Sequence, residues 1–500
     1  MKDLRSKIVR NARVLVGGAT RADPLDLLIE KGRISAIGAP GMAAPADAEL
    51  VDASDRLIIP GLVNAHTHAH GGLGKGAVGD RLPLEMFLTG SGAINGSRTL
   101  EDKYLSAQLS AVEMLKKGCT AAYDLFVEYP VPSIEGVDAV ARAYRDVGLR
   151  AVIAPMMSDR TLYQAYPGLV DSLPEHLREG ARRAASAPYA ESLRACRAIL
   201  QHWPHDRDTI RPALGPTIPM HCSDDFLTGC RDLAHEFDIG LQTHLAESAT
   251  QAVIAKQRYG RSLTAHLAEL GLLNERFSGA HAIWIDREDM RRIADAGGAI
   301  AHNPLSNLRL GSGLAAVREM LDCGLTVGIG TDAGNTSDTQ NMFEAARLAS
   351  YLSRIRGPEY REWLTAAEAF TLATAGSARV LGFGDSIGAI APNAFADLVF
   401  LDLAHINYVP LRDALLQLVN GESGTAIDAV MVGGRFVLHE GRLLTVDEAK
   451  MRRDAQAARD RLDHANAGAM HAAHAMEDWV GEFCIAHART PGLPNRRLGA

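Results

Sequence analysis

The sequence predicts an α/β protein centred on a (β/α)8 (TIM) barrel, with a composite β-sandwich formed by its N- and C-terminal flanks. Eight short apolar runs of strand length alternate with helical patterns between residues 61 and 332. β-rich segments of similar texture stand before and after this central part. Strand and helix alternating eight times is typical of a parallel barrel surrounded by helices.

The composition agrees with a large globular fold. The chain has 500 residues, of which 47% are hydrophobic and 22% charged, so it can bury an extensive core. The net charge of -8 provides no overall attraction to nucleic acid or to an anionic membrane. We therefore expect a protein that acts on a small molecule and binds neither nucleic acid nor a membrane.

The first predicted unit combines residues 1–60 with residues 385–445. Residues 7–60 alternate short β-rich runs with turns, and the same texture returns at ADLVFLDL (396–403) and AVMVGGRFVLHEGRLL (429–444). Neither flank has enough strands to bury a sheet face by itself. We therefore expect one β-sandwich built from both ends of the chain.

The second predicted unit, residues 61–384, is the barrel domain. Between its strands, residues 105–118 place Leu105, Leu109, Val112 and Leu115 at helical spacing before Gly118. The eight predicted strands are GLVNAHTH (61–68), GCTAAYDLF (118–126), LRAVIAPMM (149–157), IRPALGPT (210–217), IGLQTHLA (239–246), SGAHAIWI (278–285), GAIAHNPL (298–305) and GLTVGIGTD (324–332).

The third predicted unit is a helical tail, residues 446–500. Its Ala-rich and charge-rich pattern predicts one or two amphipathic helices that pack on the chain or contact another subunit.

The six cysteines are scattered without a CxxC pair, and the N-terminal segment lacks the apolar run of a secretory signal. No run of 18 apolar residues occurs, so we expect a cytoplasmic protein that does not span a membrane.

Possible metal ligands stand at the ends of four predicted strands. His66 and His68 are two residues apart, so strand pleating directs both imidazoles to the same side, where they can share one metal ion. His244, His281 and Asp332 close the fifth, sixth and eighth strands. Singly, each histidine has a structural interpretation as a hydrogen-bonded barrel residue, and Asp332 has one as a helix cap. Because barrel strands end at one rim, their joint occurrence predicts a metal site.

Further rim residues follow the strands. Glu247 stands three residues after His244, where its carboxylate can transfer a proton to a substrate; the alternative is a first-turn acid of the next helix. Substrate contacts are predicted at the positions after strands four, six, seven and eight, namely Thr217, Trp284, Asn303 and Asn335.

Six motifs extend over most of the chain: PGLVNAHTH, EMLKKGCTAAYD, THLAE, GAHAIW, HNPLSNLRLGSG and GTDAG. On these motifs the chain resembles the amidohydrolase superfamily, in its cytosine deaminase-like branch with guanine, S-adenosylhomocysteine and triazine deaminases and hydrolases. The resemblance implies one divalent metal ion, zinc or alternatively iron(II), held by His66, His68, His244 and Asp332. It also implies that Glu247, His281 and Asp332 act on substrate and water, and barrels of this type often form homo-oligomers.

Two sequence details refine this expectation. Binuclear relatives bridge their metals with a lysine at the end of strand four, and IRPALGPTIP contains no lysine, which favours a mononuclear site. Thr217 follows Pro216 where deaminases of this branch commonly carry a substrate-contacting histidine. The segment after PLE and the loop after Asp332 also depart from the branch pattern, so the substrate loops differ from those of its known activities.

The expected activity is metal-dependent hydrolysis, with deamination of an amino-substituted N-heterocycle by a metal-activated hydroxide and Glu247 as proton shuttle. One alternative is cleavage of an amide, urea or carbamate C–N bond, or loss of an alkylamine or chloride from a triazine-like ring. A more distant alternative is a non-catalytic scaffold of the same fold. A scaffold is expected to have lost metal ligands, and all four are present here.

Overall fold

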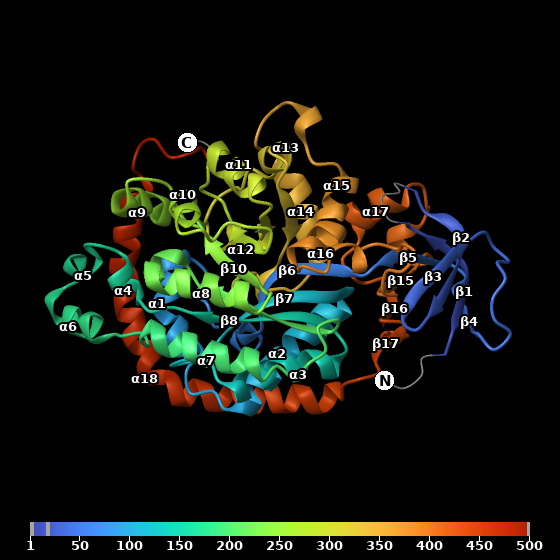
Figure 1. The fold of residues 1–500 in the computed structure, drawn as a ribbon, viewed down its shortest axis with the longest axis horizontal. Coiled ribbons are helices and arrows are strands. Elements are labelled where there is room, and N and C mark those ends of the chain that lie inside the picture. Colours follow the sequence, from blue (N-terminus) through green and yellow to red (C-terminus); the bar gives the residue numbers. More distant parts are fainter. Residues whose placement is uncertain (1–4, 17–20, 498–500) are drawn as a thin grey trace.

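The computed structural model describes residues 5–16 and 21–497. Residues 1–4, 17–20 and 498–500, which belong to the predicted β-rich flank and tail, lie outside the described residues. The strands form two sheets, a parallel one in the centre and a second one built from both ends of the chain (Figure 1).

The central sheet confirms the predicted barrel. Its strands pair in chain order and in parallel, and nearly every residue in them is buried, which explains their continuous apolar character. The strands are β6 Leu62–His68, β7 Cys119–Val127, β8 Arg150–Met157, β9 Ile210–Pro216, β10 Gly240–Leu245, β11 Phe277–His281, β12 Ala299–His302, β13 Thr326–Ile329 and β14 Asp332–Ala333.

The eighth barrel strand is split into β13 and β14, and the split closes the barrel. β13 pairs with β12, whereas β14 pairs in parallel with β6, the first strand. In this register Asp332 lies opposite Thr67 and Ala333 opposite His68. The closure therefore brings Asp332 next to His68, although the two residues are 264 positions apart in the chain.

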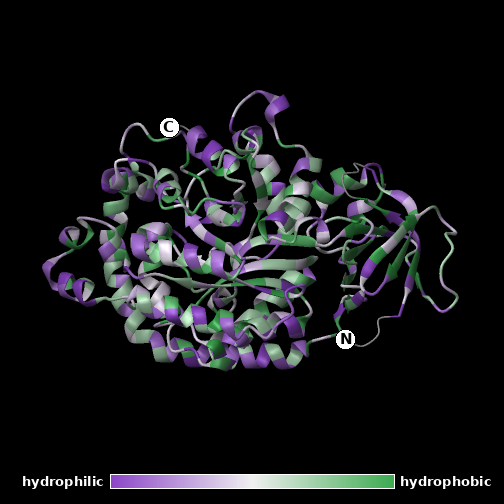
Figure 2. Cartoon of the chain, viewed as in Figure 1, coloured by the Kyte–Doolittle hydropathy of each residue, from purple (hydrophilic) through white to green (hydrophobic). Residues whose placement is uncertain are grey.

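Helices surround the barrel, and Figure 2 shows their outward parts largely purple while the central strands are largely green. They are α1 Leu84–Ile94, α2 Leu100–Lys116, α3 Ile134–Val147, α4 Leu162–Ala165, α5 Leu169–Ser172, α6 Glu175–Arg183, α7 Tyr189–Gln201, α8 Asp224–Glu236, α9 Ala249–Tyr259, α10 Leu263–Glu269, α11 Arg287–Asp295, α12 Pro304–Arg309, α13 Val317–Asp322, α14 Met342–Arg354, α15 Ala366–Thr371, α16 Ser377–Val380, α17 Ala414–Gly421 and α18 Glu448–Ala488. Short 3-10 helices are η1 Ala69–Gly74, η2 Pro219–His221, η3 Tyr360–Glu362, η5 Gly384–Ser386 and η6 Ile406–Tyr408, and η4 Leu372–Gly376 is one turn of π-helix.

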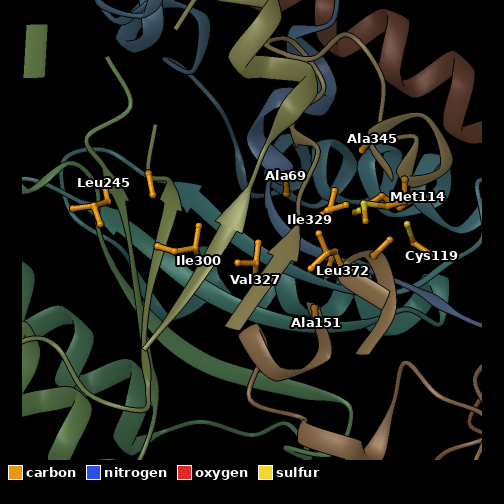
Figure 3. Close-up of a cluster of buried hydrophobic side chains, with 14 of the residues drawn as sticks. Ala69, Met114, Cys119, Ala151, Leu245, Ile300, Val327, Ile329, Ala345 and Leu372 are labelled. Carbon is orange, nitrogen blue, oxygen red and sulfur yellow. The ribbon is translucent and has the colours of Figure 1, made fainter. Parts of the chain in front are cut away.

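A continuous apolar core lies between these helices and the barrel strands (Figure 3). Leu245, Ile300 and Ile329 extend outward from the strands and are fully buried. Met114 and Leu372 reach the same core from the surrounding helical layer. Each large apolar side chain buried here stabilises the fold by about 1.5–3 kcal/mol. This packing holds the strand ends, and hence the rim, in place.

The second sheet confirms that both flanks build one β unit. Antiparallel pairing of β5 with β15 joins the N-terminal strands to the C-terminal ones in a single nine-stranded sheet, and β5 continues through Gly61 into the first barrel strand. The three domain boundaries stay predictions. The strands are β1 Lys7–Val14, β2 Asp23–Glu30, β3 Arg33–Gly38, β4 Glu49–Asp52, β5 Arg56–Pro60, β15 Leu398–Asp402, β16 Ile427–Val432, β17 Arg435–His439 and β18 Arg442–Leu443.

The tail forms one helix, α18, which is 41 residues long and packs against α1, α2 and α9 (Figure 1, red). Residues 489–497 then return to the barrel rim. There the Arg496 guanidinium donates hydrogen bonds to the carbonyls of Ile283 and Ile285, both at 2.8 Å. Among the described helices, α18 included, none has the apolar character and length needed to cross a bilayer.

Candidate metal centre

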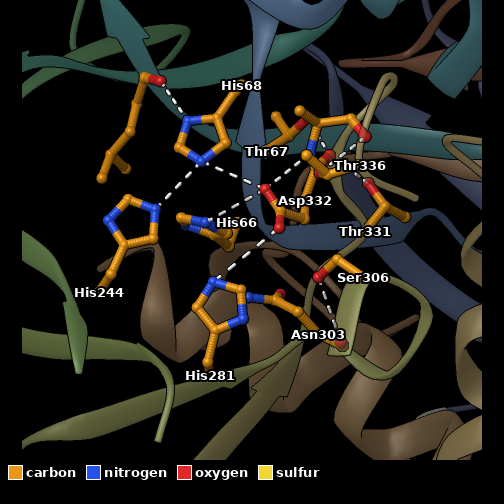
Figure 4. Close-up of polar contacts among 12 residues, drawn as sticks. His66, Thr67, His68, His244, His281, Asn303, Ser306, Thr331, Asp332 and Thr336 are labelled. Atoms are coloured by element: carbon orange, nitrogen blue, oxygen red, sulfur yellow. Dashed lines mark hydrogen bonds and ion pairs between the residues drawn. The ribbon is translucent and has the colours of Figure 1, made fainter. Parts of the chain in front are cut away.

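Four histidines at the carboxyl ends of the barrel strands are held by their Nδ1 atoms (Figure 4). Nδ1 of His68 donates to the Leu125 carbonyl at 2.5 Å and that of His244 to the Thr217 carbonyl at 2.6 Å. Oxygen atoms of Gln242 and Asn307 accept from His66 at 2.7 Å and from His281 at 2.8 Å. Because each Nδ1 is the donor, each Nε2 is left with a lone pair.

The Nε2 atoms converge on Asp332. Nε2 of His68 lies 3.2 Å from Asp332 Oδ1 and 3.1 Å from Nε2 of His244. Nε2 of His66 lies 3.8 Å from Asp332 Oδ1, and Nε2 of His281 lies 3.9 Å from Asp332 Oδ2. The four sequence-predicted ligands and His281 therefore meet at one point.

This donor set fits a divalent metal ion. Ligand atoms of His66, His68 and Asp332 lie within 4.8 Å of one another, and so do those of His66, His244 and His281. Nε2 of His66 and Nε2 of His281 are buried without a hydrogen-bond partner in the described residues. Buried polar atoms without a partner are costly, whereas neutral imidazoles and a carboxylate are ordinary zinc ligands.

The protonation states suit such a site. Burial and the neighbouring His68 hold the pKa of His66 well below its usual value, and burial lowers the pKa of His244 to about 3. Burial opposes the charge on Asp332, but the hydrogen bond and charge of His68 outweigh it, so the pKa of Asp332 is well below its usual value. In return, the hydrogen bond and charge of Asp332 outweigh the burial of His68 and raise its pKa. The site thus offers neutral imidazoles at His66 and His244 and an ionised carboxylate at Asp332, and His68 has to lose its proton to bind a metal ion.

Two residues of the centre have strained backbones. His281 has φ 67° and Asp332 has φ 63°, which is the left-handed region that residues with a side chain seldom occupy. His281 is the last residue of β11 and Asp332 the first residue of β14, and both side chains point into the rim (Figure 4). Strain of this kind, about 1–3 kcal/mol per residue, is concentrated at functional sites.

Glu247 lies at the edge of the centre. Its Oε2 is 3.6 Å from Nε2 of His281, and its Oε1 is buried without a hydrogen-bond partner in the described chain. Burial, the charge of Asp332 and that of Glu85 raise its pKa well above the usual value. The helix N-cap after it is Ser248, whose hydroxyl accepts from the Gln251 N–H, so Glu247 itself does not cap α9. The Glu247 carboxyl, whose protonated form is favoured by burial, therefore faces the converging ligand atoms from the side of His281.

The four predicted substrate-contact residues all lie at the rim but in different settings. The Thr217 carbonyl accepts from His244, and Trp284 Nε1 donates to the Ser312 carbonyl at 2.9 Å. The amide groups of Asn303 and Asn335 are buried, and none of their polar atoms has a hydrogen-bond partner in residues 5–16 and 21–497. These two amides are available to a ligand.

Several partners of the centre were not predicted. Gln242 precedes His244 by two residues on β10, so strand parity could have identified it. The carbonyls of Leu125 and Thr217 carry no sequence signal, because any residue supplies a carbonyl. Glu85 is likewise unpredicted: it is buried on α1, and its carboxylate accepts from the Ser248 hydroxyl.

The chain matches two named relatives over nearly their whole length. The 5-methylthioadenosine/S-adenosylhomocysteine deaminase of Pyrococcus abyssi is 30% identical over 448 residues, 89% of this chain and 97% of the relative. The enzyme of the same name from Desulforudis audaxviator is 33% identical over 461 residues, 91% of this chain and 98% of the relative.

Solved structures agree with the fold. A zinc-bound adenosine deaminase from Xanthomonas campestris matches with TM-score 0.81 and 26% identity, over 92% of this chain and 99% of its own. A triazine hydrolase from Arthrobacter aurescens matches with TM-score 0.80 and 25% identity, over 91% and 99%. The model of the amidohydrolase family matches residues 57–437. The chain belongs to the amidohydrolase family, a family of hydrolases.

Proposed function

We propose that this protein is a metal-dependent aminohydrolase that removes an amino group from an N-heterocycle and releases ammonia. The observation that carries the proposal is the convergence of three imidazoles and one carboxylate beside the buried carboxyl of Glu247, whose pKa is raised. Relatives and a structural neighbour named as deaminases support it.

We propose His66, His68, His244 and Asp332 as ligands of one divalent ion, zinc or alternatively iron(II). Zinc in the adenosine deaminase neighbour supports the first choice. A divalent ion bound there supplies Lewis acidity, which lowers the pKa of a coordinated water to about 7. β9, where a second metal would need a lysine, contains none.

The proton transfers are assigned to side chains of this chain. Asp332 Oδ2, which faces His281, accepts a proton from the attacking water. Nε2 of His281 orients that water, because the Asn307 oxygen fixes the other ring nitrogen. Glu247 donates its proton to the ring nitrogen of the substrate, then takes over the proton that Asp332 received from the water and passes it to the departing amine. The hydroxyl proton that remains on the product returns to Glu247, so both carboxyl groups end in their starting states. The raised pKa of Glu247 supplies the protonated form that the first of its transfers requires.

The substrate is proposed to bind between the metal centre and the loops after β9, β11, β12 and β14. The unpartnered amides of Asn303 and Asn335 are suited to the polar edge of a heterocycle. Trp284 adds an aromatic side chain, and Thr217 stands at the end of β9. The relatives named for 5-methylthioadenosine, S-adenosylhomocysteine and 5'-deoxyadenosine make aminopurines the first substrate class to assay.

A second candidate keeps the same machinery and changes the leaving group. The triazine hydrolase and the atrazine chlorohydrolase among the structural neighbours support loss of chloride or an alkylamine from a triazine ring. Amide, urea and carbamate bonds are the other C–N bonds open to the same attack. Because ammonia, chloride and alkylamines are distinct products, product analysis separates these candidates.

The test is a panel of aminopurines, pterins, pyrimidines, triazines and ureas, with the metal content of the protein measured in each preparation. Ammonia release from a heterocycle by metal-loaded protein is the expected result. Release of only chloride or alkylamine would replace the first candidate by the second. No turnover of any member by fully loaded protein would contradict both and favour a non-catalytic scaffold.

We further propose a homo-oligomer located in the cytoplasm, acting on a small molecule and binding neither nucleic acid nor membrane. The net charge of -8 supports the absence of a nucleic-acid partner. Light scattering coupled to size-exclusion chromatography measures the oligomeric state directly, and a monomer over the micromolar range would contradict that part.

A further inference from the structure

A cavity of about 460 Å³ lies between α1, α9 and the C-terminal end of α18, and its wall includes Ser248, the residue that follows Glu247. Its lining includes Glu85 from α1 and Ser248 from the start of α9, both buried. It also includes Arg489 and Arg497 from the returning segment after α18. The family model ends at residue 437, so this wall of the cavity lies outside the matched part of the chain.

The inner end of the cavity borders the proposed catalytic residues. Ser248 directly follows Glu247 in the chain, and its hydroxyl donates to the Glu85 carboxylate. Ser312 also lines the cavity, and its carbonyl accepts a hydrogen bond from Nε1 of Trp284, three residues after His281. A ligand in the cavity is therefore next to both loops that carry Glu247 and His281.

The middle of the cavity is apolar. Leu84 and Met86 of α1, Leu310 after α12 and Ile485 of α18 line it, and Ile485 is 43% exposed there rather than packed. Gly481 permits this shape, because a Cβ at that position would come within 2.7 Å of the Met86 sulfur. An apolar spacer of a ligand is thus accommodated between the inner and outer ends.

The outer end is positively charged. Arg81, Arg489 and Arg497 line the cavity and are exposed, and within the described part of the chain none of them forms an ion pair. The Arg497 guanidinium lies 5.5 Å from the centre of the Trp284 ring, so it is placed over a proposed substrate-contact residue. Glu85 is the one acidic residue in the lining, and it lies at the buried inner end.

We propose that this cavity is a subsite for a substituent of the substrate, and that the substituent has an apolar spacer and ends in an anionic group, a carboxylate or a phosphate. The inference rests on the proposed function for the position of the heterocycle at the metal centre. Guanidinium groups bind both anions through paired, charge-assisted hydrogen bonds. The C-terminal segment thereby selects among substrates that share one heterocycle.

A binding experiment tests the subsite without any turnover. Full-length protein is titrated by calorimetry with hexanoate, with hexyl phosphate and with uncharged hexanol. We expect the better of the two anions to bind about tenfold more tightly than hexanol, and this preference to weaken as salt is added. Comparison of hexanoate with hexyl phosphate identifies which anion the subsite prefers.

The variant R81Q/R489Q/R497Q removes the three charges, and R452Q, an exposed arginine elsewhere on α18, is the matched control. The preference is expected to disappear in the triple variant and to persist in R452Q. Equal binding of anions and hexanol by the unaltered protein would overturn the proposal, as would an unchanged preference in the triple variant. All four altered side chains are exposed, so melting temperatures close to that of the unaltered protein are expected.

A turnover experiment separates this inference from the proposed function. 5'-Methylthioadenosine, its 2-carboxyethylthio analogue and AMP share adenine and differ at the 5' end. We expect the anionic compounds to have the lower KM in the unaltered protein and the triple variant to lose that advantage with kcat little changed. Ammonia release without this difference would refute the subsite only; absence of ammonia from every heterocycle would refute the deaminase and leave the calorimetric result decisive for the subsite.

Discussion

The two ends of the barrel bury charged groups in opposite ways. At the amino end, Arg150 begins β8 and forms an ion pair with Asp397, at 2.8 Å between Nε and Oδ2 and 3.2 Å between Nη2 and Oδ1. Arg150 also donates to the Asp208 carbonyl, and Asp397 accepts from the Gly433 N–H at 2.7 Å. Both side chains are less than 5% exposed and fully partnered.

At the carboxyl end, the buried ionisable groups are incompletely partnered. His66, His281 and Glu247 each retain a polar atom without a hydrogen bond in the described residues, and His281 has a left-handed backbone. Buried charges that only support a fold need complete partners, since an unpaired one costs several kcal/mol. The incomplete set at the rim is therefore explained by ligands that the folded chain is built to receive.

The substitution Glu247→Gln is expected to have the largest effect of any change that leaves the metal centre intact. It removes the proton shuttle while keeping shape and metal ligands, so kcat should fall about 10³-fold with the metal content unchanged. Melting temperature should not fall, since an incompletely partnered buried acid is replaced by a neutral amide. Near-normal turnover would show that Glu247 is not the shuttle. Glu422→Gln, at a buried glutamate outside the centre, is the control.

The substitution His66→Ala tests the ligand set. Loss of one of four ligands should lower the metal content measured by elemental analysis and abolish turnover. His471→Ala, at an exposed histidine of α18, should leave both unchanged. An unaltered metal stoichiometry in the His66 variant would refute ligation by that residue. The same comparison applies to Asp332→Ala.

The substitution Arg150→Met removes the cation of the buried ion pair at the amino end of the barrel. Asp397 then remains buried without its cation, and the free energy of unfolding should fall by about 3–5 kcal/mol. The double variant Arg150→Met/Asp397→Leu should recover most of this loss, and folded protein of both variants should keep its turnover. A single variant as stable as the unaltered protein in denaturant titration would contradict this account of the pair.

Removal of the metal ion should lower the stability of the protein, and the loss should depend only on the proposed ligands at the carboxyl end of the barrel. A chelator leaves the imidazoles and Asp332 without their shared ligand, and the loss of a tightly bound ion is worth about 3–4 kcal/mol of stability. Calorimetric melting should show a lowered transition that readdition of zinc restores. In His66→Ala the chelator should have little effect; an equal drop there would place the stabilising metal elsewhere.

The smallest effect is expected at Asp289, a buried acid of α11 with partial partnering by Ser262 and Arg292. Burial raises its pKa to about 6. Between its unfolded value of about 3.9 and this value, the folded state binds more protons than the unfolded state, so this group's contribution to stability falls as pH rises. Asp289→Asn should remove that slope, by about 2 kcal/mol between pH 4 and 7. Unfolding titrations with the same slope in both proteins would disprove it.

The sequence by itself determined the barrel and the convergence of the predicted ligands at one rim. Alternating apolar runs and helical patterns identified eight strands, and parallel barrel strands necessarily end at one rim. His66 and His68 were paired by strand parity, and Glu247 was placed by its distance from His244 along the chain. The barrel is confirmed because period and strand polarity are local properties of the chain, whereas metal binding and the role of Glu247 stay predictions.

Only the tertiary structure decided how the ligands are oriented and what completes the rim. The carbonyls of Leu125 and Thr217 hold two imidazoles, and carbonyls have no residue signature. Asp332 reaches His68 because β14, part of the last barrel strand, pairs with β6, the first barrel strand. Residues 489–497 return to the loops after β11 by way of α18, a long-range contact that no local period encodes.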